Sequence, residues 1–346
     1  MSRTLRNTLP AYGASGALML ACLTGDTTWA QAKTEASVTV RHAIEQGLEL
    51  VQKAARNYPD HRVCFSCHHQ TLPMFAMATA RDRGFTIDEA LLEEQAEFTR
   101  DFYRGRVKMM REGKGVGGRG MTAGYALWAF DLADQAPDEV TDGLVSYLLK
   151  TQEPDGHWKL QSKRPPLEES TVTATFLAGY YMELFADQET VSDAVDRAKQ
   201  WVETAKPKSQ EDLNFKLLAA AKNGGDSSTI YRLRTRILDR QDEDGSWRQI
   251  VGMPGDAYAT GQTLLILLET RDGSTTTALA IERGIAFLLK DRKADGSWHV
   301  KSRSKPIQKL FDNGDPHGTD QFISTAATAW AVAALAWSLP EEEARP

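Results

Sequence analysis

The chain has 346 residues, of which 41 % are hydrophobic and 25 % charged, and its formal net charge at pH 7 is −6. These proportions are ordinary for a soluble globular protein, and the negative charge argues against general nucleic-acid binding. The one arginine cluster, at Arg232, Arg234, Arg236 and Arg240, fits the solvated face of a single helix.

The first 30 residues are organised like a secretory signal peptide. Arg3 and Arg6 supply a positive start, an apolar stretch runs from Gly16 to Leu23, and Ala30 offers a small residue for cleavage. The apolar stretch is much shorter than the roughly 20 residues that a membrane-spanning helix needs, and no later segment qualifies. We therefore predict a signal peptide over residues 1–30, export to the periplasm or beyond, and no integral membrane segment in the mature chain.

The next feature along the chain is Cys64-Phe-Ser-Cys67-His68. This is the pattern for covalent attachment of a c-type haem. The two thiols can form thioethers to the vinyl groups of one porphyrin, and His68 then follows as the axial iron ligand. The motif predicts haem c held by Cys64, Cys67 and His68, with a periplasmic redox partner. Four residues are candidates for a second iron ligand, with His317 preferred over the others: His61, Met74, Met77 and His317.

The same cysteines admit other interpretations. Once the signal peptide is removed, Cys64 and Cys67 are the only cysteines in the chain. In an oxidising compartment they can form a disulfide or act as a redox dithiol. Together with His68 and a fourth ligand they can also hold zinc. A pair of buried, chemically inert cysteines is the remaining alternative.

Apolar residues at helical spacing predict about twelve helices and almost no strands, so the chain is expected to be all-α. Six of these helices carry one apolar stripe and much charge, as outer helices do: residues 38–57, 87–111, 137–151, 191–205, 228–241 and 275–290. The other six are rich in small residues and Thr, which lets helices pack closely, as inner helices do: residues 71–83, 121–134, 171–186, 211–222, 257–271 and 322–338. Thr86-Ile-Asp-Glu89 has the pattern of a capping box at the start of the 87–111 helix.

A repeated turn joins several outer helices to the inner helices that follow them. It reads Gln152-Glu-Pro-Asp-Gly-His-Trp158, Gln241-Asp-Glu-Asp-Gly-Ser-Trp247 and Arg292-Lys-Ala-Asp-Gly-Ser-Trp298. Asp-Gly ends a helix and forms a tight turn because Gly accepts positive φ. The Trp can then cover the end of the helix. A degenerate copy near Trp201 would complete a period of about 45 residues, which is typical of paired-helix repeats.

These turns, with Gly143 or Gly284 about one helix upstream, resemble the repeats of squalene-hopene cyclases and protein prenyltransferases. The resemblance implies an α/α toroid, with about six helix pairs forming an inner barrel inside an outer barrel around a central cavity. It covers residues 115–338 clearly and residues 38–111 only through helix pairing, so residues 31–346 are expected to form one domain. Segments 164–170 and 316–327 look like a bacterial branch of that superfamily.

The chemistry of the characterised relatives does not carry over directly. The chain has no Asp-x-Asp-Asp, the acid cluster of triterpene cyclases, and no Cys after Cys67 to complete a prenyltransferase zinc site. If the helix pairing is right, the segments before the inner helices share one rim of the cavity: 64–68, 114–120, 168–170, 256–258 and 312–320. Glu169, Asp256 and Asp320 on this rim are the candidate catalytic acids, although each one also fits a simple helix cap.

Three functional hypotheses follow from the sequence. The leading one is an exported toroid with a c-type haem at the cavity mouth, serving electron transfer or redox chemistry on a bound ligand. The second is a cyclase-like enzyme with a non-standard acid. The third is a non-catalytic module that binds a small-molecule, lipid-like or glycan ligand in the central cavity.

Overall fold

The computed structural model describes residues 26–305 and 309–339, with side chains from residue 37. Over these residues the regular structure is helical, and no β-strand forms. The helices are α1 (Asp26–His61), α2 (Leu72–Arg81), α3 (Glu89–Arg104), α4 (Val107–Arg111), α5 (Arg119–Leu132), α6 (Glu139–Thr151), α7 (Thr171–Phe185), α8 (Gln188–Thr204), α9 (Gln210–Lys222), α10 (Ser227–Leu238), α11 (Ala257–Glu269), α12 (Thr275–Asp291) and α13 (Gln321–Ser338). A short π-helical turn, Cys67–Thr71, leads into α2, and a 3₁₀ turn, Gly318–Asp320, leads into α13.

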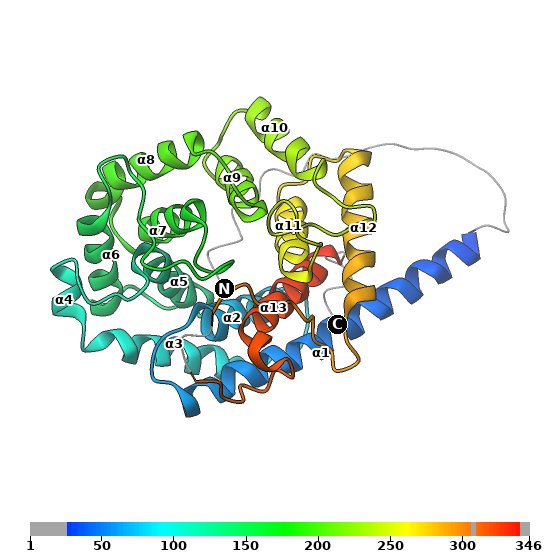
Figure 1. The fold of residues 1–346 in the computed structure, drawn as a ribbon, viewed down its shortest axis with the longest axis horizontal. Coiled ribbons are helices and arrows are strands. Elements are labelled where there is room, and N and C mark those ends of the chain that lie inside the picture. The colour runs from blue at the N-terminus through cyan, green and yellow to red at the C-terminus, as the bar shows by residue number, and fades with distance from the viewer. Residues whose placement is uncertain (1–25, 306–308, 340–346) are drawn as a thin grey trace.

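The helices form two concentric rings. Successive helices of the inner ring pack against one another, and α13 packs against α2 to close it: α2, α5, α7, α9, α11 and α13. The outer ring consists of α1, α3 with α4, α6, α8, α10 and α12, and Figure 1 shows it surrounding the inner helices. The predicted all-α toroid, with alternating outer and inner helices, is therefore confirmed.

Most helices begin at side-chain caps. Seven aspartates and serines accept a backbone N–H from the first helical turn, which satisfies donors that have no partner within the helix. These caps are Asp88, Asp138, Ser170, Ser209, Asp226, Asp256 and Ser274. The capping box predicted at Thr86 is wrong by two residues, because Asp88 accepts the Leu91 N–H at 3.2 Å.

Two expected boundaries differ from the structure. The predicted helix 87–111 is two helices, which separate at Gly105 and Arg106, where the Arg106 guanidinium bonds the Phe102 carbonyl and lies over its ring. Helix α1 begins at Asp26, well before residue 38, and its first turns project from the body of the molecule in Figure 1. Of the predicted signal peptide, residues 1–25 lie outside the described residues and 26–30 begin α1.

No helix among the described residues is both long and apolar enough to cross a membrane.

The three repeated turns are built alike. Each indole is fully buried, and its Nε1–H donates to the carbonyl ten residues earlier, at the C-terminal end of the preceding outer helix. These bonds join Trp158 to Leu148 (3.0 Å), Trp247 to Ile237 (2.8 Å) and Trp298 to Leu288 (2.7 Å). The backbone N–H of each Trp donates to a threonine of the following inner helix: Thr175, Thr260 or Thr328. One indole thus satisfies a helix end and joins the two rings.

The glycines of these turns touch the next outer helix. Gly156, Gly245 and Gly296 have φ of 102°, 91° and 86°. A Cβ on Gly156 or Gly245 would collide with the backbone of Arg197 on α8 or Arg283 on α12. On Gly296 it would lie 2.6 Å from the Cβ of Gln46 on α1. The third turn therefore closes the outer ring between α12 and α1.

The degenerate copy expected at Trp201 does not form such a turn. Trp201 lies within α8, stacks on His157 with ring centroids 5.0 Å apart, and donates to Asp155 at 3.2 Å. It therefore packs on the outside of the first turn, and only residues 205–209 connect α8 to α9.

We predict that Gly296→Ala destabilises the fold more than Gly273→Ala. Both glycines have positive φ, at 86° and 72°, but only Gly296 has close neighbours, whereas no atom lies within 4 Å of a Cβ at Gly273. The control substitution adds only backbone strain, about 1–2 kcal/mol, and Gly296→Ala adds about 1–3 kcal/mol more from the clash. Urea unfolding measures both, and equal losses would contradict ring closure through this turn.

Candidate functional site

The side chains that line the axis of the inner barrel change in polarity along its length. On α9 the helical spacing places Glu211, Phe215, Leu218 and Lys222 on one face. On α11 the corresponding residues run from Tyr258 and Gln262 to Glu269. The end of the barrel at the helix N-termini is therefore polar, the middle is aromatic and aliphatic, and one charged pair lies at the far end.

The middle of the barrel contains a partly open chamber of about 50 Å³. Trp128 is one of its lining residues, and its ring centroid lies 4.9 Å from that of Phe75, 5.8 Å from that of Tyr181 and 6.3 Å from that of Trp330. Of the described residues that line the chamber, only Lys222 and Glu269 are charged, and they face each other at 3.7 Å. Aromatic faces attract positive charge, so this chamber suits an apolar ligand or one that becomes cationic.

Glu211 lies at the polar end of the barrel, almost fully buried. The Thr173 hydroxyl donates to one carboxylate oxygen at 2.8 Å and the Tyr258 hydroxyl donates to the other at 3.0 Å. Burial raises the pKa of Glu211 to about 7, and the two hydroxyls oppose this rise only in part. A carboxyl with this pKa carries a proton half of the time at neutral pH, as a general acid or base requires.

Glu211 is not among the site residues predicted from the sequence. It stands between Ser209 and Asp212, which form a capping box at the start of α9, so its carboxylate looked like an ordinary acidic residue of a first helical turn. The available signal was the i, i+4 spacing of Glu211 and Phe215, which places the carboxyl on the face that the apolar residues of α9 occupy.

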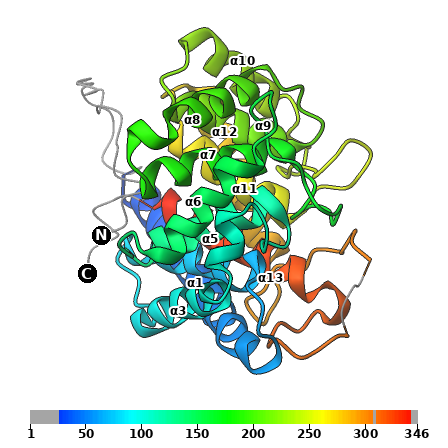
Figure 2. The same ribbon diagram turned by 90° about the vertical axis from the view of Figure 1, so that its left-hand side faces the viewer.

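Loops from three repeats meet over the polar end of the barrel. In Figure 2 the green, yellow and orange loops that precede α7, α11 and α13 project at the same end of the molecule. Arg303 joins them by donating to Gln249 at 2.7 Å and to Glu169 at 2.6 Å, and the Ser304 hydroxyl donates to the Pro165 carbonyl at 2.9 Å. The shared rim predicted from helix pairing is therefore present in the structure.

The structure brings only one of the three predicted acids close to Glu211. Glu169 lines the same small cavity, of about 10 Å³, together with Glu211, Tyr258 and Arg303. Asp256 caps α11 by accepting the Ala259 N–H at 2.9 Å, and burial raises its pKa to about 6.

Asp320 has a different environment. It accepts the Ser302 N–H at 2.9 Å and pairs with His299 at 2.9 Å. Burial alone would raise its pKa, but the Ser302 and His299 contacts together lower it. Asp320 is therefore ionised at neutral pH and has the contacts of a structural carboxylate.

Cys64 and Cys67 are free, partly exposed cysteines just before α2. Cys64 Sγ lies 3.3 Å from the Tyr58 hydroxyl. Burial, followed by the charge of Glu168, raises the pKa of the Cys67 thiol to about 12, so this thiol is protonated at neutral pH. Arg164 and Glu168 of the rim loop therefore lie close enough to act on the motif electrostatically.

The two histidines after Cys67 are held differently. His68 stacks on Phe322 at 4.8 Å, and its Nδ1 lies 2.9 Å from the Ser66 hydroxyl and in contact with His69 Nδ1. Burial lowers the pKa of His68 to about 3 and that of His69 well below its usual value, so both rings are neutral. His69 is fully buried against Tyr58, with Nε2 2.5 Å from Asn313. Across the described residues, Nε2 of His68 has no hydrogen-bond partner.

Each candidate second iron ligand is already engaged in a hydrogen bond, a ring contact or core packing. His317 Nε2 is 2.6 Å from the Ser297 hydroxyl, and its ring stacks on His299 at 4.4 Å. Met74 and Met77 are fully buried in the core, and His61 packs on Phe311. Within the described part of the chain, no three His, Cys, Asp or Glu side chains are grouped to hold a metal ion.

Comparison with known proteins gives matches only at the level of structure. No family model and no curated protein matches the chain. The type II terpene cyclase MstE from Scytonema, in complex with merosterolic acid A, has a TM-score of 0.60 at 14 % identity, over 89 % of this chain and 99 % of that one. The fold is the α/α toroid of the type II terpene cyclases.

Two further structures show how widely this toroid is used. ent-Copalyl diphosphate synthase from Streptomyces platensis has a TM-score of 0.50 at 18 % identity, over 77 % of this chain and 50 % of that one. Unsaturated glucuronyl hydrolase from Bacillus sp. GL1 has a TM-score of 0.53 at 13 % identity, over 86 % and 96 %. At these identities the likeness establishes the fold, and the chemistry has to be argued from the site.

We predict that stability falls as pH rises through the pKa of Glu211. The folded carboxyl, with its pKa raised from 4.5 to about 7, binds a proton more tightly than the unfolded one. The free energy of unfolding should therefore drop between pH 5 and pH 8, by up to about 3 kcal/mol. Asp256 and Asp315, whose pKa values burial raises to about 6 and about 7, contribute drops of the same sign. Urea unfolding of Glu211→Gln should therefore show a drop that is smaller by the Glu211 contribution, and the exposed control Glu243→Gln should keep the full drop. The same pH dependence in wild type and Glu211→Gln would disprove the assignment.

Proposed function

We propose that the chain is an acid–base enzyme that binds an apolar small molecule in the aromatic chamber and uses Glu211 to transfer a proton. The observation that carries this proposal is a buried carboxyl with a pKa of about 7, which lines the small cavity at the polar end of the barrel, about one helical turn before Phe215 of the aromatic chamber. Tyr258 and Thr173 orient both of its oxygens, so the acid is held in one geometry before any substrate arrives.

The chemistry follows from the two parts of the barrel. Proton transfer from Glu211 to a substrate leaves positive charge on the substrate, and the faces of Trp128, Phe75 and Trp330 can stabilise that charge. An internal nucleophile of the substrate then bonds to the cationic carbon, and loss of a proton to water completes an isomerisation. Glu211 regains its proton from solvent through the rim.

The pKa of Glu211 also restricts the substrate. A carboxyl near pKa 7 is a weak acid, so it protonates an oxygen or an electron-rich alkene more readily than an isolated double bond. Type II cyclases share the fold, and MstE is described in complex with geranylgeranyl dihydroxybenzoate. The chamber of about 50 Å³ is smaller than a cavity of about 150 Å³ that holds benzene, so it favours a shorter compound and must widen by side-chain movement to admit one. An isoprenoid epoxide of geraniol size meets both requirements, because it offers an oxygen to protonate and is shorter than geranylgeranyl dihydroxybenzoate.

To test this function, the mature protein is incubated with 6,7-epoxygeraniol and the products are separated by gas chromatography and mass spectrometry. We expect a cyclic isomer of the same mass, and about a 10²–10⁴-fold loss of kcat in Glu211→Gln. Glu243→Gln should retain full activity, and tryptophan fluorescence should show that Glu211→Gln still binds the epoxide. Turnover that survives in Glu211→Gln, or a wild type that neither binds nor converts the epoxide, would refute the proposal.

The segment from Cys64 to His68 favours a second role, as a covalent haem site. Its donor types fit the group: two free thiols, of which that of Cys67 is buried, precede a buried histidine whose Nδ1 lies 2.9 Å from the Ser66 hydroxyl and whose Nε2 has no partner among the described residues. Cys64 and Cys67 would hold the porphyrin and His68 the iron. The group would supply one-electron redox chemistry to the rim, and this role needs the predicted export. A zinc site and a disulfide are the competing uses of the same residues.

A pyridine haemochrome spectrum tests the haem site. The protein is expressed with its own N-terminus beside c-type haem attachment machinery. We expect a haemochrome band that survives acid–acetone extraction in wild type and is lost in Cys64→Ser/Cys67→Ser. Two titratable thiols and no Soret band in wild type would exclude haem, and metal analysis would then separate zinc from a free dithiol. N-terminal sequencing of the exported protein tests the predicted cleavage near residue 30.

A further inference from the structure

The junction between α8 and α10 is one of three in the outer ring that have no Asp-Gly-Trp turn. The turns after α6, α10 and α12 each pack against the next outer helix, but the short connection after α8 passes directly into α9. A groove consequently opens between α8 and α10, with α9 as its floor and a volume of about 550 Å³. Its size falls within the range of small-molecule sites, about 300–1,000 Å³. We call it the α8–α10 groove.

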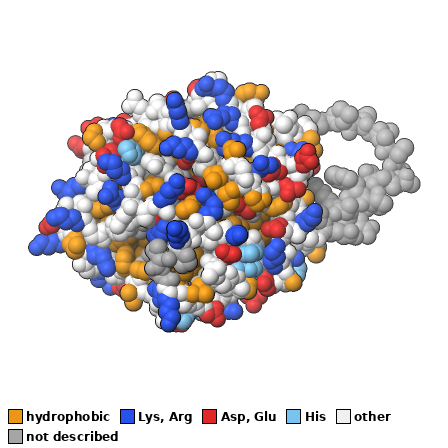
Figure 3. All heavy atoms as spheres, viewed as in Figure 1, with side chains coloured by type: hydrophobic (Ala, Val, Ile, Leu, Met, Phe, Trp, Pro, Cys, Tyr) orange, Lys and Arg blue, Asp and Glu red, His pale blue; other side chains and the backbone are white. Residues whose placement is uncertain are grey.

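The groove carries an excess of positive charge in a protein whose net charge is negative. Five cationic side chains line it, from α8, the connection after α8, α9 and α10: Lys199, Lys206, Lys216, Arg232 and Arg236. Lys and Arg side chains also gather over the upper part of the face in Figure 3, where α8 and α10 lie. Of these five residues, Lys199 pairs with Glu183, outside the lining, at 3.1 Å.

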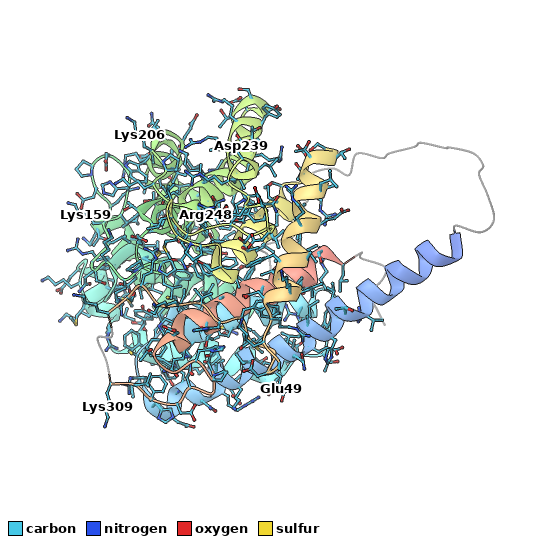
Figure 4. All side chains as sticks on the ribbon, turned by 45° about the vertical axis from the view of Figure 1, so that its right-hand side comes forward. Glu49, Lys159, Lys206, Asp239, Arg248 and Lys309 are labelled. Atoms are coloured by element: carbon cyan, nitrogen blue, oxygen red, sulfur yellow. The ribbon has the colours of Figure 1, made fainter. Side chains whose placement is uncertain are left out.

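The two acidic residues of the lining, Asp226 and Glu203, offset only part of this charge. Asp226 caps α10 by accepting the Thr229 N–H at 2.9 Å, and hydrogen bonds from Ser228 and Thr229 lower its pKa. Glu203 is exposed. Among the described residues, Lys206 and Arg236 have no carboxylate partner. Lys206 projects at the upper edge of the molecule in Figure 4.

Lys216 places a charge at the bottom of the groove. Its side chain is only 7 % exposed, although it carries an ammonium group. Nζ donates to the carbonyls of Val202 at 2.5 Å and Glu203 at 2.8 Å, at the C-terminal end of α8. An ammonium has three donors, and these bonds use two of them. Burial is the main cause that lowers the pKa of Lys216. The charge of Glu203 opposes this change, and the repulsion of Arg236 adds to it.

We propose that the α8–α10 groove binds a phosphate or diphosphate ester. Lys206, Lys216, Arg232 and Arg236 have no carboxylate partner among the described residues. Several such cations together match an anion of two or three charges better than a single carboxylate. The free donor of Lys216 meets a phosphate oxygen at the floor. The apolar part of the ester then lies against the aliphatic surface of the groove, formed by Val202, Ala219, Ala220 and Leu233. The site lies outside the aromatic chamber and needs no activity of Glu211.

Isothermal titration of the mature protein with inorganic pyrophosphate tests the site. We expect saturable binding that weakens with added salt, and at least a tenfold weaker affinity, about 1.4 kcal/mol, in Lys206→Gln/Arg236→Gln. Both residues are exposed, so the variant should fold, and circular dichroism checks this. Lys108→Gln, an exposed lysine on α4, is the matched control and should bind as wild type. Absent binding, or equal losses in both variants, would overturn the proposal.

Two further measurements distinguish a soluble phosphate ester from a lipid headgroup as the ligand. Geranyl diphosphate should bind more tightly than pyrophosphate, because its chain covers the aliphatic surface of the groove. Vesicles of phosphatidylglycerol test a lipid headgroup: sedimentation with the vesicles that pyrophosphate reverses assigns the site to a lipid. Vesicle binding that pyrophosphate leaves unchanged, together with no gain for geranyl diphosphate, would contradict the groove as the site.

Discussion

The toroid depends on one repeated contact, the buried indole that donates to the last carbonyls of the preceding outer helix. This bond removes an unsatisfied group from a helix end, and the same Trp backbone holds a threonine of the inner ring. The adjoining glycine lets the turn approach the next outer helix more closely than any side chain would allow. Each turn therefore fixes three helices at once, and the last one joins α12 to α1.

Ring closure explains the electrostatics of the axis. Because six inner helices pack side by side around it, Glu211 is withdrawn from water, and burial becomes the largest influence on its pKa. The same exclusion of water keeps His68 and His69 neutral and the Cys67 thiol protonated. A carboxyl, two imidazoles and a thiol thus have shifted pKa values for one physical reason, their position inside the inner ring or at its rim.

The sequence was sufficient to predict the helices and their alternation, because periodicity and small-residue content are local properties. The contacts across the rim could not be predicted. Asn313 meets His69 across 244 positions of sequence, and Arg303 reaches Glu169 across 134. Glu211 was hidden because a capping box accounts for acidic residues at a helix start. The α8–α10 groove lies where no Asp-Gly-Trp turn follows the outer helix. A repeated sequence motif marks the turns that exist and gives no signal where a turn is absent.

The closing contact between the two ends of the chain also constrains assembly. Helices α1 and α2 are synthesised first, yet each packs extensively against α13, the last helix. Until residue 338 has emerged, the other helices can form only an open arc, with the apolar faces of α1 and α2 uncovered. Long-range closure of this kind is slow, and exposed apolar surface favours aggregation. The nascent protein is therefore prone to aggregate until α13 has been synthesised and packs against α1 and α2.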